Sequence, residues 1–169
     1  MEIVKNYKPI SAEWLENLTQ FNTFLTITCR GGDMPLKSLV RMLSEFYKRN
    51  LPDATIFTAY EPHANGIGYH GHSMARIPRS RIEKLTSIKQ DGKPTYCRKL
   101  WRKLHRKFGR SSVSEIKDQS HVTNYCQKRV FDYATKDNQA VFALQFGSSA
   151  QCRRDYLSAK SDPVAYPTL

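Results

Sequence analysis

The sequence predicts one α+β domain of ferredoxin-like, RRM-like architecture, in which a central five-stranded antiparallel sheet carries flanking helices. Short segments rich in β-branched and aromatic residues alternate with longer segments whose apolar residues recur at helical spacing. At 169 residues, the chain is long enough for one hydrophobic core and too short for two comfortable ones. We expect residues 1–147 to form the domain, with its motif-bearing core at 21–147, and residues 148–169 to be a polar tail or linker.

The first predicted strand, Phe21 to Cys29, alternates apolar and threonine positions and has strong β propensity. We expect it to be the central strand of the sheet, with Thr26 and Thr28 on one of its faces. Further strands are predicted at residues 54–60, 69–77, 111–116 and 140–146.

Three longer helices are predicted between these strands, and we expect them to cover one face of the sheet. The first begins at Pro35 and ends near Asn50. The second spans residues 96–108 and ends at Gly109, a favourable C-cap, and the third spans 121–136. The polar, basic residues 78–94 are expected to form a loop or a short helix.

The charge of the chain points to a polyanionic partner. Lysine and arginine outnumber aspartate and glutamate by 27 to 15, which gives a net charge of +12 and a pI near 9.7. Nucleic acid is the first expectation for such a chain. The 96–108 helix is its densest basic segment, either a DNA contact or a solvated face.

Membrane association and export are not expected. No apolar run approaches the roughly 18 residues that a membrane-spanning helix needs, and the N-terminal segment lacks an apolar signal core. Cys29, Cys97, Cys126 and Cys152 show no CxxC spacing and are expected to be reduced thiols in the cytoplasm. A zinc site built from Cys97, Cys126 and a histidine is an alternative.

Two histidines stand one residue apart on the third predicted strand. Because alternate residues of a strand share a face, His70 and His72 would present their imidazoles side by side. Glu61 lies just before them, and a hairpin turn at Asn65-Gly66 would bring its carboxylate opposite the imidazoles. Two nitrogens and one oxygen suit a divalent cation, whereas an exposed His-x-His pair is also compatible with a solvated surface.

The third predicted helix contains Tyr-x-x-Lys twice, at Tyr125/Lys128 and at Tyr133/Lys136. On a helix, residues three apart are neighbours, so each lysine would lie close to its tyrosine. A phenol titrates near pH 10, and a nearby cation supports its attack on phosphorus. Ordinary helix packing is the alternative interpretation of this spacing.

Three motifs in this order resemble those of the HUH endonucleases, the rolling-circle replication initiators of plasmids, phages and small single-stranded DNA viruses. They are FLTIT at residues 24–28, the His70-Gly71-His72 strand preceded by Glu61, and the downstream Tyr-x-x-Lys helix. The resemblance covers about residues 21–147. Gly71 departs from the family pattern, since the residue between the histidines is usually bulky and apolar.

The resemblance implies that His70 and His72 are ligands of a divalent cation, Mg²⁺ or Mn²⁺. Glu61 would be the third ligand, with His63 as the fallback. The cation would polarise the scissile phosphate of single-stranded DNA. A tyrosine would then attack, leaving a covalent 5′-phosphotyrosine and a free 3′-hydroxyl.

Of the two tyrosines, we expect Tyr133 to be the single nucleophile and Lys136 to be its phosphate or tyrosinate partner. The residues that follow Tyr133 lead directly into a turn and a strand, which resembles the end of the family's third motif. Tyr125 with Lys128 is the alternative. The two tyrosines would be about 12 Å apart along a helix axis, so both cannot occupy one attack position.

The function that the resemblance implies is site-specific nicking and joining of single-stranded DNA at a replication origin, which would initiate rolling-circle replication. The host would be a bacterial or archaeal cell, with the protein encoded by a plasmid, phage or virus. A transposase or mobilisation relaxase of the same chemistry is the near alternative. A non-catalytic nucleic-acid-binding module is the alternative from another class. The chain has no GxxxxGK[ST] loop, so a helicase would be a host or fused partner.

Overall fold

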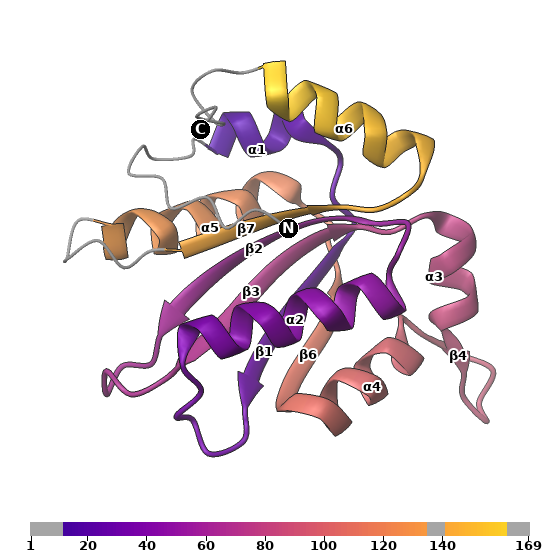
Figure 1. The fold of residues 1–169 in the computed structure, drawn as a ribbon. Helices are drawn as coiled ribbons and strands as arrows, with labels where there is room; N and C mark the ends of the chain where they lie inside the picture. The colour runs from indigo at the N-terminus through magenta and orange to yellow at the C-terminus, as the bar shows by residue number, and fades with distance from the viewer. Residues whose placement is uncertain (1–11, 135–140, 162–169) are drawn as a thin grey trace.

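Figure 1 shows the fold in a computed structural model, which describes residues 12–134 and 141–161, and the side chains of residues 12–126 and 142–161. Five strands form one antiparallel sheet in the order β6-β1-β3-β2-β7. The predicted α+β class is confirmed, because a five-stranded antiparallel sheet with flanking helices is consistent with a ferredoxin-like fold.

The strands of the sheet are β1 (Thr23–Cys29), β2 (Thr55–Pro62), β3 (Tyr69–Arg76), β6 (Gly109–Glu115) and β7 (Val141–Phe146). A separate two-stranded ribbon pairs β4 (Ser87–Ile88) with β5 (Pro94–Thr95). The helices are α1 (Ala12–Leu18), α2 (Leu36–Asn50), α3 (Arg79–Leu85), α4 (Arg98–Phe108), α5 (Gln119–Ala134) and α6 (Ala150–Ser161). Among the described residues, no helix has the length and apolar character needed to cross a membrane.

Helices cover both faces of the sheet, which corrects the prediction that they would cover one. Figure 1 shows α2 and α4 on one side of the sheet and α1, α5 and α6 on the other. Each side has its own core, one built against α2 and α4 and the other against α1, α5 and α6. Two adjacent residues of β2, Ile56 and Phe57, point to opposite cores and are both fully buried, which requires cover on both faces.

The central strand is β3, and this corrects the prediction that the Phe21 to Cys29 segment would be central. β1 lies between β3 and β6, one place from the edge of the sheet. Both β1 and β3 are therefore paired with a strand on each side. Because both are interior strands, the apolar patterns that predict buried strands do not tell which of the two is central. The strand that carries His70 and His72 is therefore hydrogen-bonded on both sides, to β1 and to β2, which fixes the positions of the two histidines.

Helix α6 occupies residues 150–161 of the segment expected to be a tail or linker, and residues 162–169 lie outside the described residues. Its Asp155 side chain is only 2% exposed, and it accepts hydrogen bonds from the Thr55 hydroxyl of β2 and from Arg76 Nε of β3. The Cys152 thiol donates to the backbone oxygen of Asp53. The helix is therefore docked largely by buried polar contacts, which leave no periodic apolar pattern in the sequence.

Candidate metal centre and tyrosine

A hairpin brings the predicted ligands together. The β2–β3 turn contains Gly66 and Gly68, both with positive φ, and it aligns Glu61 directly opposite His70. His72 lies two residues further along β3 on the same face of the sheet. The register therefore places one carboxylate and two imidazoles on neighbouring positions, as the sequence predicts.

The donor atoms of these three side chains converge. His70 Nε2 lies 3.1 Å from Glu61 Oε2, and His72 Nε2 lies 3.7 Å from Glu61 Oε1. One donor atom from each residue falls within 4.8 Å of the other two. Both histidines thus direct the same ring nitrogen, Nε2, toward the carboxylate.

The group is largely shielded from solvent. Glu61 is 3% exposed and His72 is 6% exposed, while the His70 side chain keeps 19% exposure. A carboxylate is costly to bury unless opposite charge or hydrogen bonds stabilise it, and a divalent cation would supply that charge. Two imidazole nitrogens and one carboxylate oxygen are a donor set that divalent metals accept, so the group can hold a metal ion.

The outer ring nitrogens are held by other side chains. His72 Nδ1 lies 3.4 Å from the hydroxyl oxygen of Thr26. Thr26 is the residue of β1 that pairs with His72 in the sheet. His70 Nδ1 lies 3.2 Å from His63 Nδ1, and the two rings are 4.9 Å apart between centroids. If the outer nitrogens carry the ring protons, both Nε2 atoms keep a lone pair for a metal.

His63, the fallback ligand of the sequence prediction, lies behind His70 and is not among the three converging residues. The pKa of His63 is lowered, mainly by partial burial and to a smaller extent by the charge of the neighbouring His70. The Nδ1 atom of a neutral His63 can accept a hydrogen bond from His70 Nδ1–H, which favours a positioning role. The sequence spacing offers no signal for this contact, because it depends on the shape of the turn.

The alternative zinc site of Cys97, Cys126 and a histidine does not form. Cys97 belongs to the core under α2 and α4, whereas Cys126 belongs to the core under α5 on the other side of the sheet. Among the described cysteines all four are buried free thiols. Burial and the nearby Glu61 charge raise the pKa of Cys126 to about 12, so this thiol stays protonated beside the acidic group.

Helix α5 carries Tyr125 directly to the histidines. The Tyr125 ring lies 5.4 Å from the His72 ring between centroids, at 82° between planes. Phe24 of β1 stacks on His72 at 6.0 Å and meets Tyr125 edge-on at 6.2 Å, so it braces both rings. Tyr125 is 37% exposed and accordingly remains accessible to a ligand from solvent. No sequence pattern predicts this bracing role of Phe24.

The other residues of the tyrosine prediction lie partly outside the described structure. Tyr133 lies on α5 two turns beyond Tyr125, and its side chain is outside the described residues, as is that of Lys128. Lys136 lies outside them altogether. The structure places Tyr125 against the metal-binding group, and the prediction of Tyr133 as the nucleophile stays a prediction.

Packing against α2 explains why a glycine, Gly71, stands between the two histidines. A Cβ atom at this position would lie 3.2 Å from Leu43 Cδ1 of α2. The residue between the histidines faces the opposite core, where α2 lies close to the sheet. A small residue therefore accommodates α2 without moving the two imidazoles.

Comparisons with known proteins identify no relative. No protein-family model, curated protein or solved structure matches the chain.

Proposed function

We propose that this protein is a metal-dependent endonuclease and strand transferase that nicks and rejoins single-stranded DNA through a covalent tyrosine linkage. The observation that carries the proposal is the contact between the Tyr125 ring and His72, within a group of Glu61, His70 and His72 that can hold a metal ion. A phenol beside a site for a divalent cation is the arrangement that transfer of a phosphodiester to tyrosine requires.

Tyr125 is the nucleophile in this proposal, in place of the Tyr133 expected from the sequence. Eight residues separate the two, or about 12 Å along the helix axis. With Tyr125 against His72, a residue two turns away lies beyond the reach of a phosphate held at the same ligands. Lys128 and Lys136 are proposed to contact the DNA backbone or the developing tyrosinate, as the spacing of the two motifs suggests.

The proposed step conserves atoms and charge. The Tyr125 oxygen attacks the scissile phosphorus, the bond from phosphorus to the 3′ oxygen breaks, and a 5′-phosphotyrosine forms. The phenol proton passes to solvent and the departing 3′ oxygen takes up a proton. A bound cation, Mg²⁺ or Mn²⁺, would withdraw charge from the phosphate oxygens. The phosphotyrosine retains the energy of the phosphodiester, so attack by a 3′-hydroxyl rejoins a strand without another energy source.

The surrounding side chains prepare the site for this step. Thr26 and His63 fix the orientation of the two imidazoles, and Phe24 braces Tyr125 against His72. The partly exposed Phe24 and Tyr125 also offer ring surfaces on which unpaired bases can stack. This favours a single strand as substrate, since the bases of a duplex are already stacked.

The biological role that we propose is initiation of rolling-circle replication at an origin, with unwinding supplied by a host or fused helicase. A transposase or relaxase would use the same site and differ in its DNA. A non-catalytic binding module needs neither a metal ion nor an accessible tyrosine beside it, so the pairing of the two favours the catalytic proposal.

Incubation with end-labelled single-stranded DNA and Mn²⁺ tests the proposed chemistry. The wild-type protein should form an adduct with DNA that survives SDS, and EDTA should prevent its formation. Tyr125→Phe should abolish the adduct, while Tyr156→Phe, a matched change at an exposed tyrosine on α6, should leave it intact. Binding without an adduct under all metal conditions would instead support the binding-module alternative.

A further inference from the structure

The outer surfaces of α2 and α4 form a second region rich in positive charge, on the side of the sheet opposite the metal-binding group. Four exposed cations come from α2 and five from α4, and we call them together the basic helical face. They are Lys37, Arg41, Lys48, Arg49, Lys99, Arg102, Lys103, Arg106 and Lys107. The only acidic residue on either helix is Glu45.

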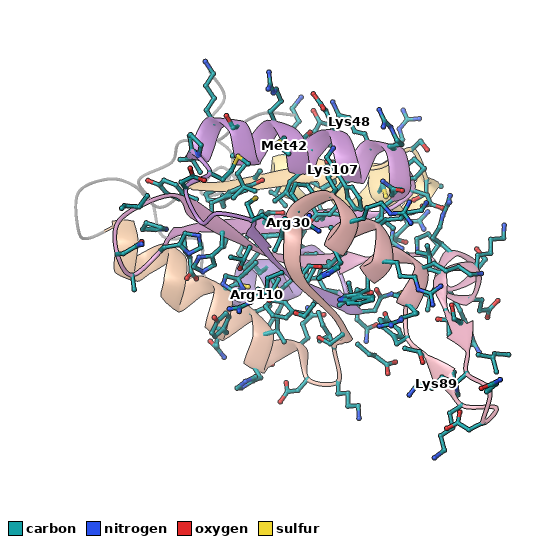
Figure 2. The ribbon with its side chains drawn as sticks, turned by 90° about the horizontal axis from the view of Figure 1, so that it is seen from below. Arg30, Met42, Lys48, Lys89, Lys107 and Arg110 are labelled. Carbon is teal, nitrogen blue, oxygen red and sulfur yellow. The ribbon has the colours of Figure 1, made fainter. Side chains whose placement is uncertain are left out.

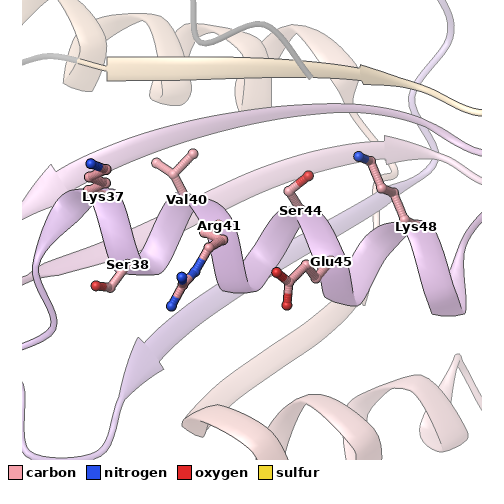
Figure 3. Close-up of a pocket in the computed structure, with 7 residues that line it drawn as sticks. All are labelled: Lys37, Ser38, Val40, Arg41, Ser44, Glu45 and Lys48. Atoms are coloured by element: carbon pink, nitrogen blue, oxygen red, sulfur yellow. The ribbon is translucent and has the colours of Figure 1, made fainter.

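The two helices form one continuous surface. The Lys103 ammonium donates to Asn50 Oδ1 at the end of α2, and the Phe46 and Phe108 rings meet beneath at 5.7 Å. An open groove of about 400 Å³ runs along α2 (Figure 3). Its lining contains three cations and one carboxylate, with two serines and a valine: Lys37, Arg41, Lys48, Glu45, Ser38, Ser44 and Val40. The charges are thus spread over two helices and are not confined to one line.

The nine cations of this face form no ion pairs with the carboxylates that the structure describes. Like charges at such density repel one another, and a polyanion that covers them releases its counterions. The face therefore has a physical reason to bind a chain of phosphates.

The ribbon of β4 and β5 extends the positive surface. Lys99 of α4 donates to the backbone oxygen of Lys84 on α3, the helix that precedes the ribbon. Figure 2 labels Lys48 on α2, Lys107 on α4 and Lys89 on the ribbon, which projects from the body of the molecule.

The basic helical face lacks what a single strand needs for stacking. Among the described residues, the large exposed hydrophobic side chains all lie outside α2 and α4. Trp101 is covered, since the Arg98 guanidinium lies 3.9 Å from its ring centroid and the His105 ring stacks on it at 5.1 Å. Its indole nitrogen also donates to the Ser111 backbone oxygen. Phosphates are therefore the groups that this face can recognise, and a duplex presents them without unpaired bases.

We propose that the basic helical face binds double-stranded DNA, independently of metal, while the opposite side of the sheet handles the single strand. The choice of DNA over RNA rests on the proposed function. The face would hold the duplex next to the region where the strand is opened, and its binding would be largely insensitive to sequence because phosphates carry no sequence information.

The test is binding of a labelled duplex of about 20 base pairs, roughly two helical turns, in EDTA. The test variant combines Arg102→Gln, Lys103→Gln, Arg106→Gln and Lys107→Gln on α4. A control of the same net charge combines Lys117→Gln, Arg153→Gln, Arg154→Gln and Lys160→Gln, which are exposed residues outside α2 and α4.

The α4 variant should lose at least about tenfold in duplex affinity, and the slope of log K against log salt should fall by about 0.9 for each phosphate contact removed. The duplex affinity of the control variant should differ from that of the wild type by less than about twofold, because its four changes lie outside the basic helical face. If the α4 variant fails to fold by circular dichroism, the four changes Lys37→Gln, Arg41→Gln, Lys48→Gln and Arg49→Gln on α2 provide the same charge-matched comparison.

Equal losses in variant and control would overturn the proposal, because affinity would then follow net charge alone. A larger loss of single-strand affinity than of duplex affinity in the α4 variant, or tighter wild-type binding to duplex RNA of equal length, would also overturn it. The assay needs neither metal nor cleavage. A nuclease that fails to bind duplex and a duplex-binding protein that forms no adduct are therefore distinguishable outcomes.

Discussion

At the scale of single residues, the site depends on which nitrogen of each imidazole faces the carboxylate. His70 and His72 both direct Nε2 toward Glu61, while His63 and Thr26 hold the outer nitrogens. The ligands and their orienting partners thus come from three adjacent strands and the turn that joins two of them. Strand alternation predicts the ligands, but it does not predict His63, whose position depends on the turn.

His72→Ala should remove divalent metal binding and cleavage while leaving DNA affinity within about twofold, because that affinity comes from the basic surface. Isothermal titration with Mn²⁺ and the adduct assay measure the two effects. His105→Ala is the matched control, since this exposed histidine lies on α4 away from the metal-binding group. Loss of folding and DNA binding together with the metal would favour a purely structural role for His72.

His63→Phe should weaken Mn²⁺ binding by about 10- to 100-fold, the usual effect of removing an outer hydrogen-bond partner from a ligand. The variant keeps a planar ring but cannot accept a hydrogen bond from His70 Nδ1–H. His63→Gln, which retains a hydrogen-bonding group, should recover part of the affinity. Unchanged metal affinity in both variants would contradict the positioning role of His63.

At the scale of elements, α5 and α6 show how far sequence patterns extend. In α5, Val122 and Cys126 are four residues apart and lie on the side that faces the sheet, where Cys126 is fully buried. This spacing does not choose between Tyr125 and Tyr133, because each tyrosine stands three residues after a valine, Val122 or Val130. That choice depends on how far α5 extends along the sheet, which is set by its docking and not by local sequence.

Helix α6 should owe much of its docking to Asp155. Asp155→Ala would leave the Arg76 cation and the Thr55 hydroxyl without their partner in a mostly buried contact. We expect a loss of about 3 kcal/mol in the free energy of unfolding, measured by urea denaturation. Asp155→Asn, which keeps the hydrogen-bonding shape without the charge, should cost less. A neutral effect of Asp155→Ala would mean that apolar contacts alone hold α6.

At the scale of the whole molecule, two cores on opposite sides of one sheet separate two surfaces of different character. The side with α5 has the metal-binding group and the accessible Tyr125 ring, whereas α2 and α4 carry dense positive charge and, among the described residues, no exposed large hydrophobic side chain. Net charge in the sequence predicts a polyanionic partner but not this division. The division depends on the order of the strands and on helices that cover both faces of the sheet. In the sequence, the only trace of this cover at β2 is that Ile56 and Phe57 are adjacent and both apolar.

The buried thiols and phenols should make the fold sensitive to alkali. Burial raises the pKa of Cys126 from 9.0 to about 12 and that of Tyr96 from 10.0 to about 12, and it also raises the pKa of Tyr47 and Tyr60. Because these folded-state values lie above the unfolded ones, their stabilisation is complete below about pH 9 and is lost as pH rises toward 12.

Urea denaturation in reducing buffer should therefore show falling stability above pH 9, by about 1.4 kcal/mol per pH unit for each group that titrates. Cys126→Ala should show a shallower decline over the same range than the wild type. A stability that stays flat from pH 8 to about pH 11 would contradict burial of these groups.

The most direct test of the central claim is mass spectrometry of the trapped DNA adduct after trypsin digestion. Cleavage at Lys117, Lys128, Arg129 and Lys136 separates the two tyrosines into residues 118–128 and 130–136. We predict nucleotide mass on the 118–128 peptide, localised to Tyr125 and absent in Tyr125→Phe. Nucleotide mass on the 130–136 peptide would contradict the assignment of Tyr125, and an unmodified pair of peptides would contradict covalent chemistry at this site.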